Sequence, residues 1–424
     1  MYRPRRIAVI GSGAAALGAA WMLSRQHEVV IFEQNSHAGG HANTVVTDEG
    51  QAVDTGFIVF NDRNYPNLVR LFEYLKVPSV DTDMSFAVSL DHGALEYRGG
   101  GGLRALFGQP SNLLSPRFLG MVTDVLRFYR EAPAFIESGD LTISLGDYLQ
   151  RNNYGQAFIE DHLLPMAAAI WSAPSSIMLE FPAASFIRFC RNHGLLQLKD
   201  RPQWRTVRGG SRVYVRRLLD DTKAEVRLNS PALGVRRMAE GIQIVSRDHG
   251  AETFDEVVLG CHADQALSLL LKPTEAQRRL LGAFSYQENL AVLHSDPSQM
   301  PQRRCVWGGW NYMGSRGEGG DRQLSVTYWM NLLQSLPQQP PLFVTLNPVG
   351  KIDEWLVHKS ITYHHPVFDT PAMKAQAELG TIQGQGHLWF CGSYFGYGFH
   401  EDAFSSGLAV ARALGCPAPW DKTS

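Results

Sequence analysis

The chain begins its first regular element with the run IAVIGSGAAA at residues 7–16. The apolar half of this run predicts a buried strand, and the Ala-rich stretch after it, up to Leu23, predicts a helix. Between them, Gly11 allows a tight turn, Gly13 lets the backbone approach a pyrophosphate, and the small Ala16 lets the helix pack closely on the strand. The run is therefore the G-x-G-x-x-G/A fingerprint of a dinucleotide site, in the strand-turn-helix context that this fingerprint requires.

A second apolar run follows the fingerprint. Val29–Phe32 predicts another strand, which ends at Glu33, 22 residues after Gly11. A carboxylate about 20 residues beyond the first glycine is the group that binds the ribose of a dinucleotide. Strand, turn, helix, strand and acid in this register favour a dinucleotide site over a coincidental glycine-rich turn.

Composition excludes several other classes of protein. Lys plus Arg number 39 and Asp plus Glu number 41 in 424 residues, a formal charge of -2, and there is no nucleic-acid-binding motif, so we expect no nucleic-acid partner. The cysteines are far apart and form no C-x-x-C pair: Cys190, Cys261, Cys305, Cys391 and Cys416. We therefore expect neither a disulfide framework nor a metal site.

The uncharged stretch Ile7–Leu23 follows three arginines and superficially resembles a signal peptide or a membrane span. It is too short and too rich in glycine for a span of about 20 apolar residues, so we expect a cytoplasmic protein. A peripheral contact with the inner face of the membrane stays open, with Arg3, Arg5 and Arg6 as weak electrostatic candidates. An ordinary solvated amino terminus explains these arginines equally well.

A glycine doublet, Gly39-Gly40, follows the ribose acid, and Thr44–Thr47 and Ala52–Phe57 then predict a hairpin. This pattern resembles the superfamily of flavin-containing amine oxidases and phytoene desaturases, over nearly the whole chain. The resemblance implies an α/β fold, in which a Rossmann-like FAD-binding domain of the GR2 type is interleaved with an α+β substrate domain. It also implies FAD rather than NAD. We expect the FAD to be noncovalent, because no Cys or His stands at a recognisable attachment motif.

Three stretches resemble one subgroup of that superfamily, the bacterial predicted NAD/FAD-binding proteins: residues 53–61, 204–211 and 392–402. Genes of this subgroup often neighbour those of methyltransferases similar to cyclopropane fatty acid synthase. This association implies an acyl-lipid substrate.

The resemblance implies a discontinuous FAD-binding domain at residues 1–85, 205–285 and 380–424, with the substrate domain at 86–204 and 286–379. Apolar runs predict strands at 225–228, 241–245, 256–260 and 388–391, and helices at 117–135, 154–173 and 405–414. The four glycines at 99–102 predict a turn, with a mobile loop as the alternative.

The resemblance also assigns residues to the cofactor. Gly56 lies where the backbone approaches the flavin ring, Ala232 lies near the adenine, and Gly392 with Ser393 lies where the ribityl chain and pyrophosphate are held. Ser393 departs from the Glu or Asp common at its place, which removes one contact, although a hydroxyl can still form a hydrogen bond. The full set of expected cofactor-binding residues is Gly11, Gly13, Ala14, Ala15, Ala16, Glu33, Gln34, Gly39, Gly40, His41, Thr55, Gly56, Phe57, Ala232, Gly392, Ser393, Phe399, Glu401, Asp402 and Ala403.

Two departures from the superfamily disfavour an amine substrate. The lysine that many amine oxidases hold by water near flavin N5 has no evident counterpart, since Asn289 or Leu290 falls at its place. The expected aromatic cage is half present: Phe399 matches one position, and Tyr363 is the candidate for the other. These two aromatic residues and His400 are the expected catalytic residues.

The histidines near these positions leave alternatives open. His400 has an ordinary pKa near 6.5, which suits proton transfer, so it is either a base or orienting group beside the flavin, or a buried histidine bonded to Glu401 or to backbone. His364 and His365 are adjacent in a predicted strand and point to opposite faces, so at most one reaches the same cavity. We expect both of them to be structural.

Core packing is the default for the aromatic residues, but together with the apolar run at 163–170 they would form a tunnel over the flavin: Trp171, Tyr286, Trp307, Trp310, Tyr312, Tyr328 and Trp329. A long hydrocarbon, isoprenoid or acyl chain is the natural guest. We therefore expect an FAD-dependent oxidoreductase that desaturates or oxidises a fatty acyl chain by hydride transfer to flavin N5.

Three alternatives stay open: a flavin-dependent fatty acid isomerase without net oxidation, an amine oxidase, and a nonenzymatic lipid carrier. Rab GDP-dissociation inhibitors are carriers of this architecture without flavin, and the retained fingerprint, Glu33 and the glycine doublet disfavour that alternative. The expected partner is a small apolar or lipid substrate, and no protein partner is inferred.

Overall fold

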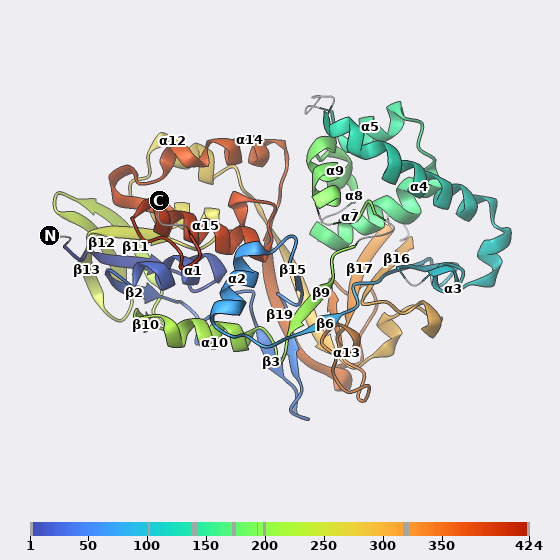
Figure 1. Ribbon diagram of the computed structural model, residues 1–424, viewed down its shortest axis with the longest axis horizontal. Helices are drawn as coiled ribbons and strands as arrows, with labels where there is room; N and C mark the ends of the chain where they lie inside the picture. Colours follow the sequence, from blue (N-terminus) through green and yellow to red (C-terminus); the bar gives the residue numbers. More distant parts are fainter. Residues whose placement is uncertain are drawn as a thin grey trace.

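The apolar run at residues 6–10 forms the central strand of a parallel sheet in a computed structural model of the chain (Figure 1). The model describes residues 3–100, 102–137, 143–171, 175–192, 194–197, 201–316 and 322–421. The sheet has the order β10-β2-β1-β14-β20, and every neighbouring pair is parallel. Its strands are β1 (Arg6–Ile10), β2 (Glu28–Phe32), β10 (Glu225–Arg227), β14 (Glu256–Leu259) and β20 (Leu388–Phe390). The order reverses beside β1, so a ligand crevice is expected at the carboxyl ends of β1 and β14.

Both faces of this sheet are covered, which explains why its strands are apolar throughout. One face, with Ile7, Val9 and Ile31, packs against α1 (Ala14–Leu23), α2 (Pro66–Tyr74), α10 (Arg212–Asp221) and α15 (His400–Ala413). The other face packs against the antiparallel sheet of β11 (Ala232–Met238), β12 (Gly241–Ser246) and β13 (Gly250–Phe254), with α11 (Ala263–Leu269) and α12 (Glu275–Leu281). We call this part of the molecule the first lobe.

Small residues allow α1 and α15 to lie against each other in the first lobe. All ten residues of α1 are buried. A Cβ atom added to Gly407 of α15 would lie 2.0 Å from the carbonyl oxygen of Ala15, and one added to Gly18 would lie 2.8 Å from the ring of Phe404. On its other side α1 meets the end of β14, where a Cβ on Gly260 would lie 2.6 Å from that of Ala16. The predicted close packing at Ala16 is therefore confirmed, and its partner is Gly260.

A second lobe is built on a seven-stranded sheet of order β19-β15-β18-β17-β16-β7-β8, in which only β16 and β7 run parallel. The strands are β7 (Phe86–Leu90), β8 (Leu95–Gly99), β15 (Tyr286–His294), β16 (Trp310–Arg316), β17 (Arg322–Trp329), β18 (Phe343–Leu346) and β19 (Val357–Pro366). Figure 1 shows the helices of the lobe gathered on one side of this sheet: α3 (Gly102–Leu106), α4 (Pro116–Glu137), α5 (Leu145–Arg151), α6 (Gln156–Phe158), α7 (Leu164–Trp171), α8 (Ser175–Glu180) and α9 (Ala183–Asn192).

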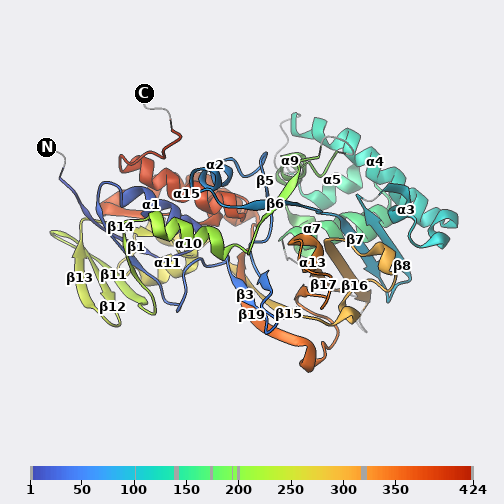
Figure 2. The ribbon, with the colours of Figure 1, turned by 60° about the horizontal axis from the view of Figure 1, so that its bottom comes forward.

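Short strands connect the two lobes, as Figure 2 shows most clearly. The predicted hairpin is confirmed as β3 (Thr44–Val46) and β4 (Ala52–Asp54). Next to it, β5 (Phe60–Asn61), β9 (Trp204–Val207) and β6 (Ser79–Thr82) form a small antiparallel sheet, and α13 (Met330–Leu333) lies nearby in the second lobe. The α/β fold with a Rossmann-like lobe is therefore confirmed.

Two predicted helices differ from the structure in their bounds or continuity, and a helix that was not predicted is present. The last helix, α15, begins at His400 rather than at 405, because the Asp402 carboxylate accepts hydrogen bonds from the N–H groups of Tyr397 and Phe399 and so starts the helix early. The helix expected at 154–173 is divided by a π-helical turn at Ile159–Leu163, and residues 172–173 lie outside the described part. Helix α14 (Thr370–Glu378), placed by sequence in the substrate domain, packs on α12 of the first lobe, where Arg279 pairs with Glu378 at 2.7 Å.

Within the described residues, no helix has the length and apolar character needed to cross a bilayer. Of the glycines at 99–102, Gly99 ends β8 and Gly102 begins α3, while Gly101 lies outside the described part.

We predict that Gly407→Ala destabilises the fold by about 1–3 kcal/mol, because the new methyl group cannot fit against the Ala15 carbonyl. Gly120→Ala is the matched control, since Gly120 also lies inside a helix but a Cβ there would meet no atom within 4 Å. That change should stabilise the protein by up to about 1 kcal/mol. Urea unfolding measures both, and equal effects of the two substitutions would contradict the close contact of α1 and α15.

Candidate active site

The fingerprint turn leaves open space in front of α1. Gly11 has φ +95°, a conformation that favours glycine, and a Cβ on it would lie 3.0 Å from the Gly260 carbonyl oxygen. Gly13 has an ordinary extended conformation and precedes α1 without any side-chain cap. A Cβ on Gly13 would meet nothing within 4 Å. The first N–H groups of a helix have no partner within it, so this space suits an anion such as a pyrophosphate.

The glycine doublet lies directly on the fingerprint turn. The Gly39 N–H donates to the Ser12 carbonyl oxygen at 2.9 Å, and a Cβ on Gly40 would lie 3.1 Å from the Cα of Gly13. Both glycines have positive φ angles, +122° and +57°. The structure therefore brings together the two glycine motifs that the sequence places 26 residues apart, counted from Gly13 to Gly39.

Glu33 is buried at the end of β2, and its carboxylate faces the same turn. Its Oε2 accepts a hydrogen bond from the Ser12 hydroxyl at 2.6 Å, and its Oε1 accepts two from Asn35 at 2.8 Å. The Ser230 N–H donates to the Glu33 carbonyl oxygen at 2.8 Å, which brings the segment before Ala232 beside this acid. Oε2 keeps capacity for a further hydrogen bond, as a ribose would require. Gln34, also expected at the cofactor, is exposed.

The amino-terminal turn and the carboxy-terminal loop meet at Cys261. A Cβ on Gly11 would lie 3.6 Å from the Cys261 nitrogen, and a Cβ on Gly392 would lie 3.5 Å from the Cys261 carbonyl oxygen. The Cys391 N–H donates to the Leu259 carbonyl oxygen at 3.1 Å, so the loop is held beside the end of β14. Ser393 follows Gly392 and begins a 3-10 turn, with its carbonyl accepting hydrogen bonds from Gly396 and Gly398.

The side chains at the start of α15 are engaged by the protein. His400 stacks on Phe57 with ring centroids 3.9 Å apart, and its Nε2 shares a hydrogen bond of 2.6 Å with the Tyr214 hydroxyl. Burial lowers the pKa of His400 to about 3. Glu401 accepts hydrogen bonds from the backbone N–H groups of Asn67 and Leu68, so it caps α2. The expected role of Glu401 in cofactor binding and the expected role of His400 in catalysis stay predictions.

Two further predicted residues in this region have backbone or capping contacts. Burial raises the pKa of Asp402 to about 6, although its carboxylate accepts the two N–H bonds that begin α15. The Ala403 N–H donates to the Phe399 carbonyl at 3.1 Å, within the first turn of the same helix. Asp402 therefore holds the helix end that a ligand in this region would meet.

The two cage candidates have different neighbours in the structure. Phe399 stacks on Phe189 of α9, with centroids 5.0 Å apart, and so joins the first lobe to the helices of the second. Tyr363 lies on β19, and its hydroxyl bonds Thr55 Oγ1 at 2.7 Å and accepts from Asn43 Nδ2 at 3.0 Å. Thr55 thus contacts the candidate site through Tyr363.

The structure gathers three histidines beside Tyr363, which we call the histidine cluster: His41, His262 and His365. The ring centroid of His41 lies 5.4 Å from that of His365, 6.2 Å from that of His262 and 4.8 Å from that of Tyr363. The His41 Nε2 atom is buried and has no hydrogen-bond partner. Burial lowers the pKa of His41 and of His262 to about 4 and that of His365 to about 3, so the cluster is uncharged at neutral pH.

Asn289, one of the two residues expected at the place of the missing lysine, supports this cluster. It is fully buried, and its Nδ2 donates to Nδ1 of His365 at 3.0 Å, while its Oδ1 accepts from Asn347 at 2.8 Å. His365 Nδ1 is therefore the acceptor nitrogen of a neutral ring, and the hydrogen is on Nε2. His364 lies 3.3 Å from Glu288, but its ring centroid also lies 6.4 Å from that of His262, so His364 borders the cluster as well.

Gly56 is required by the backbone next to the cluster. The Phe57 N–H donates to the His41 carbonyl oxygen at 2.8 Å, and a Cβ on Gly56 would lie 2.2 Å from that oxygen. The carbonyl contact explains this glycine, whereas its expected approach to a flavin ring stays a prediction.

Sequence reasoning missed Asp54, which is fully buried and joins three segments. Its carboxylate accepts hydrogen bonds from the Thr44 hydroxyl (2.6 Å), from the Ser211 N–H (2.8 Å) and hydroxyl (2.7 Å), and from the Gln334 amide (2.9 Å) of the second lobe. Burial raises the pKa of Asp54 to about 6. The signal available in the sequence was the position of this acid in an otherwise apolar predicted strand, which indicates burial.

His262 was also missed. It follows the carboxyl end of β14, where ligands of such sheets bind, and its ring stacks on Tyr286 with centroids 4.4 Å apart. Most of the other predicted tunnel aromatics instead pack within the core of the second lobe: Trp307, Trp310, Tyr312, Tyr328 and Trp329. The side chain of Trp171 lies outside the described part.

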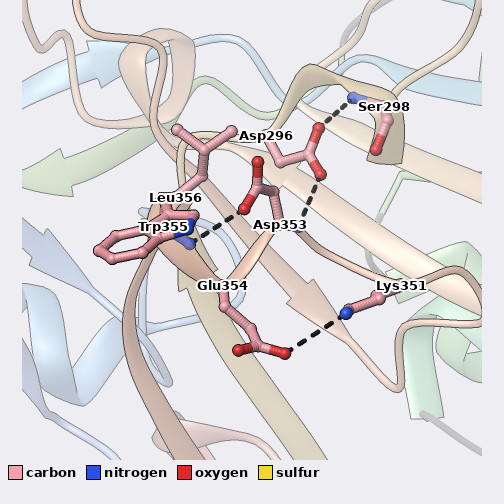
Figure 3. Close-up of a pocket in the computed structure, with 7 residues that line it drawn as sticks. All are labelled: Asp296, Ser298, Lys351, Asp353, Glu354, Trp355 and Leu356. Carbon is pink, nitrogen blue, oxygen red and sulfur yellow. Dashed lines mark hydrogen bonds and ion pairs between the residues drawn. The ribbon is translucent and has the colours of Figure 1, made fainter.

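One open cavity, of about 570 Å³, lies away from these loops (Figure 3). It is lined by Asp296, Ser298, Lys351, Asp353, Glu354, Trp355 and Leu356. Asp296 accepts hydrogen bonds from the N–H groups of Ser298 and Asp353, and Glu354 pairs with Lys351 at 3.4 Å. These carboxylates hold the turn in place and do not form a second active site.

One family model matches the chain, and many solved structures share its fold. A family model described as flavin-containing amine oxidoreductase matches residues 17–330. None of the curated protein sequences matches the chain.

Solved structures of similar fold include a CLA-producing fatty acid isomerase from P. acnes (TM-score 0.68, 15% identity, covering 97% of this chain and 99% of the other). A putative protoporphyrinogen oxidase from Exiguobacterium sp. 255-15 has a TM-score of 0.66 and 16% identity, over 98% of this chain and 99% of the other. Putrescine oxidase bound to putrescine has a TM-score of 0.68 and 15% identity, over 97% and 99%. At these identities the likeness concerns the fold alone.

We predict that His365→Asn makes stability less sensitive to acid. The folded chain binds a proton at His365 only near pH 3, whereas the unfolded chain binds it at the ordinary value of 6.5, so acidification from neutral pH favours unfolding. The substitution should remove up to roughly 2 kcal/mol of the stability lost between neutral pH and about pH 5. Urea unfolding at both pH values measures this. Parallel pH profiles for the two proteins would show that His365 is not held neutral.

Proposed function

Because the chain belongs to the flavin-containing amine oxidoreductase family, we propose that it binds FAD noncovalently and oxidises an apolar substrate, a fatty acyl chain or a modified one, by desaturation. Membership in the family, which rests on the match over residues 17–330, makes the protein a flavin-dependent oxidoreductase. The choice of FAD, its noncovalent attachment and the acyl substrate are our proposals.

The donor set of the first lobe fits FAD. The open space at Gly13 and the uncapped start of α1 would take the pyrophosphate, and Glu33 would bind the adenosine ribose. The unpartnered His41 Nε2 gives a buried polar atom that a bound group would satisfy. Gly392 lies beside Cys261, which also borders Gly11 of the fingerprint turn. A bound flavin supplies an acceptor for the two electrons of a hydride.

The neutrality of the histidine cluster carries the proposal for an apolar substrate. The pKa values of its members lie at about 3 to 4, and the neighbouring side chains include those of Tyr363, Tyr286, Asn289 and His364. An ammonium substrate would need negative charge or an open aromatic cage, and these groups supply no negative charge. A hydrocarbon chain needs neither.

Desaturation requires the substrate to lose a proton as well as a hydride. His400 was the base expected from sequence, but its Nε2 is engaged by Tyr214. His41 has a buried ring nitrogen without a partner, so we propose His41 as the proton acceptor and His400 as a positioning residue. His365, held by Asn289, would orient His41 through their ring contact.

A fatty acid isomerase is the second candidate, since one protein of that activity shares the fold. Isomerisation returns the hydride to the substrate, so it consumes no electron acceptor, whereas desaturation consumes one for each product. An amine oxidase or a flavin-free lipid carrier would conflict with the neutral cluster and with the retained glycine motifs, respectively.

We predict that Gly13→Leu abolishes flavin binding without unfolding the protein, because its side chain would enter the space at the start of α1, where a Cβ meets no atom within 4 Å. Gly380→Leu is the control, since a Cβ there also meets nothing within 4 Å and the residue is exposed. Flavin absorbance per mole of purified protein should fall at least about tenfold in the first variant only. Retention of flavin in Gly13→Leu would place the cofactor elsewhere.

We further predict that acid precipitation of the yellow protein leaves its flavin in the supernatant.

Anaerobic mixing with acyl lipids, but not with simple amines, should bleach the bound flavin, because the neutral cluster accepts an uncharged chain. Bleaching by putrescine and not by lipids would overturn the proposed substrate class. Lipid turnover without consumption of an acceptor would favour the isomerase.

A further inference from the structure

Five leucines on consecutive elements of the second lobe project into solvent. Their exposed fractions are 74% for Leu103, 54% for Leu113, 88% for Leu114, 43% for Leu119 and 48% for Leu126. They lie on α3, on the 3-10 turn Pro110–Leu114 and on the first half of α4. Exposed leucines are ordinary when scattered singly, but here five of them fall within 24 residues of the chain. We call these five residues the leucine ridge.

On helix α4, the ridge occupies only the first half of the helix. Leu119 and Leu126 are seven residues apart, so they lie on the same side of the helix. The other exposed positions in this half are Pro116, Arg117, Gly120 and Thr123, of which only Arg117 is charged. Farther along the helix, the exposed positions include Arg130, Glu131 and Glu137. A solvated helix would be expected to carry charge along its whole outer face.

The surroundings of the ridge are basic. The sequence has no Asp or Glu between residues 97 and 123, a stretch that contains Arg98, Arg104 and Arg117. Arg117 is paired with Asp161 at 2.8 Å, whereas Arg104 is exposed beside Leu103. Arg304 is also exposed, and its turn reaches the ridge because a Cβ on Gly108 would lie 2.8 Å from the side chain of Val306. The exposed cations beside the ridge are therefore Arg104 and Arg304, whereas the acids near it are paired: Asp124, within its own segment, with Arg127 at 3.0 Å, and Glu160 with Arg117 at 3.1 Å.

We infer that the leucine ridge inserts into the surface of an anionic lipid bilayer. Leucines that enter the boundary between headgroups and acyl chains, with arginines at the level of the phosphates, are the usual elements of interfacial binding. Figures 1 and 2 agree that α3 forms the end of the second lobe far from the first, so a planar membrane can reach it. A second copy of the chain would instead need a flat, self-complementary patch of about 800 Å² per partner.

This surface differs from the amino-terminal arginines considered from sequence. Arg5 pairs with Glu256 at 3.0 Å and Arg6 with Glu252 at 2.7 Å, so both are neutralised within the first lobe. The inference rests on the second lobe alone and does not depend on the proposed reaction. If the substrate is an acyl lipid, however, the ridge would bring the protein to the membrane that contains this lipid.

The test is co-sedimentation of the full flavin-loaded protein with vesicles. Vesicles of phosphatidylcholine mixed with phosphatidylglycerol should bind the protein, those of phosphatidylcholine alone should bind it more weakly, and added salt should weaken the binding. The double variant Leu113→Ser, Leu114→Ser should lower the vesicle affinity at least about tenfold. Arg104→Gln should lower it selectively for the anionic vesicles.

The matched control is the double variant Leu233→Ser, Leu271→Ser. These leucines are 58% and 55% exposed but lie on the first lobe, so their replacement should leave vesicle binding unchanged. Thermal unfolding of each variant confirms that it is folded. The inference is overturned if the unmodified protein binds neither kind of vesicle, if both double variants lose binding equally, or if light scattering shows a dimer that only the Leu113, Leu114 variant disrupts.

Discussion

The contact between the first and the last helix of the first lobe is the constraint on which the rest of the structure depends. Gly407 lies against the Ala15 carbonyl, Gly18 against the Phe404 ring, and Gly260 against Ala16. In each case a Cβ on the glycine would come too close to the neighbouring atom, so no side chain can be placed there. These contacts hold the fingerprint turn and the start of α15 at the same edge of the parallel sheet. Gly11 and Gly392, almost four hundred residues apart in the sequence, therefore meet at Cys261.

Burial is the second organising factor, because it determines which groups carry charge. The histidine cluster is kept neutral, whereas Asp54 has its pKa raised to about 6 and is held by four hydrogen bonds that link both lobes. Asn289 belongs to the same design: an amide at that position orients a histidine, where a lysine would bring a positive charge into the site. The polarity around the proposed active site is thus directional but uncharged.

Motifs that depend on local backbone geometry were predictable from the sequence. Gly11, Gly13, Gly39 and Gly40 require special turns or close approach, and the strands flanking them are apolar, so the fingerprint, the doublet and the hairpin were found in their correct relation. Groups brought together only by the tertiary fold were not. Nothing near His262, Asp54 or Phe189 in the sequence indicates that they meet His41, Gln334 and Phe399. The early start of α15 escaped prediction for a similar reason, since Asp402 caps a loop that has no helical periodicity.

The division of the first lobe among distant parts of the chain has a consequence for its synthesis. Strand β20 and helix α15 come from the last 40 or so residues, and without them the sheet lacks one edge and α1 lacks its packing partner. During translation, the first lobe therefore stays incomplete until β20 and α15 have been synthesised, after the second lobe. Uptake of the prosthetic group is therefore expected only after β20 and α15 have been synthesised, so a polypeptide that ends before them should stay colourless.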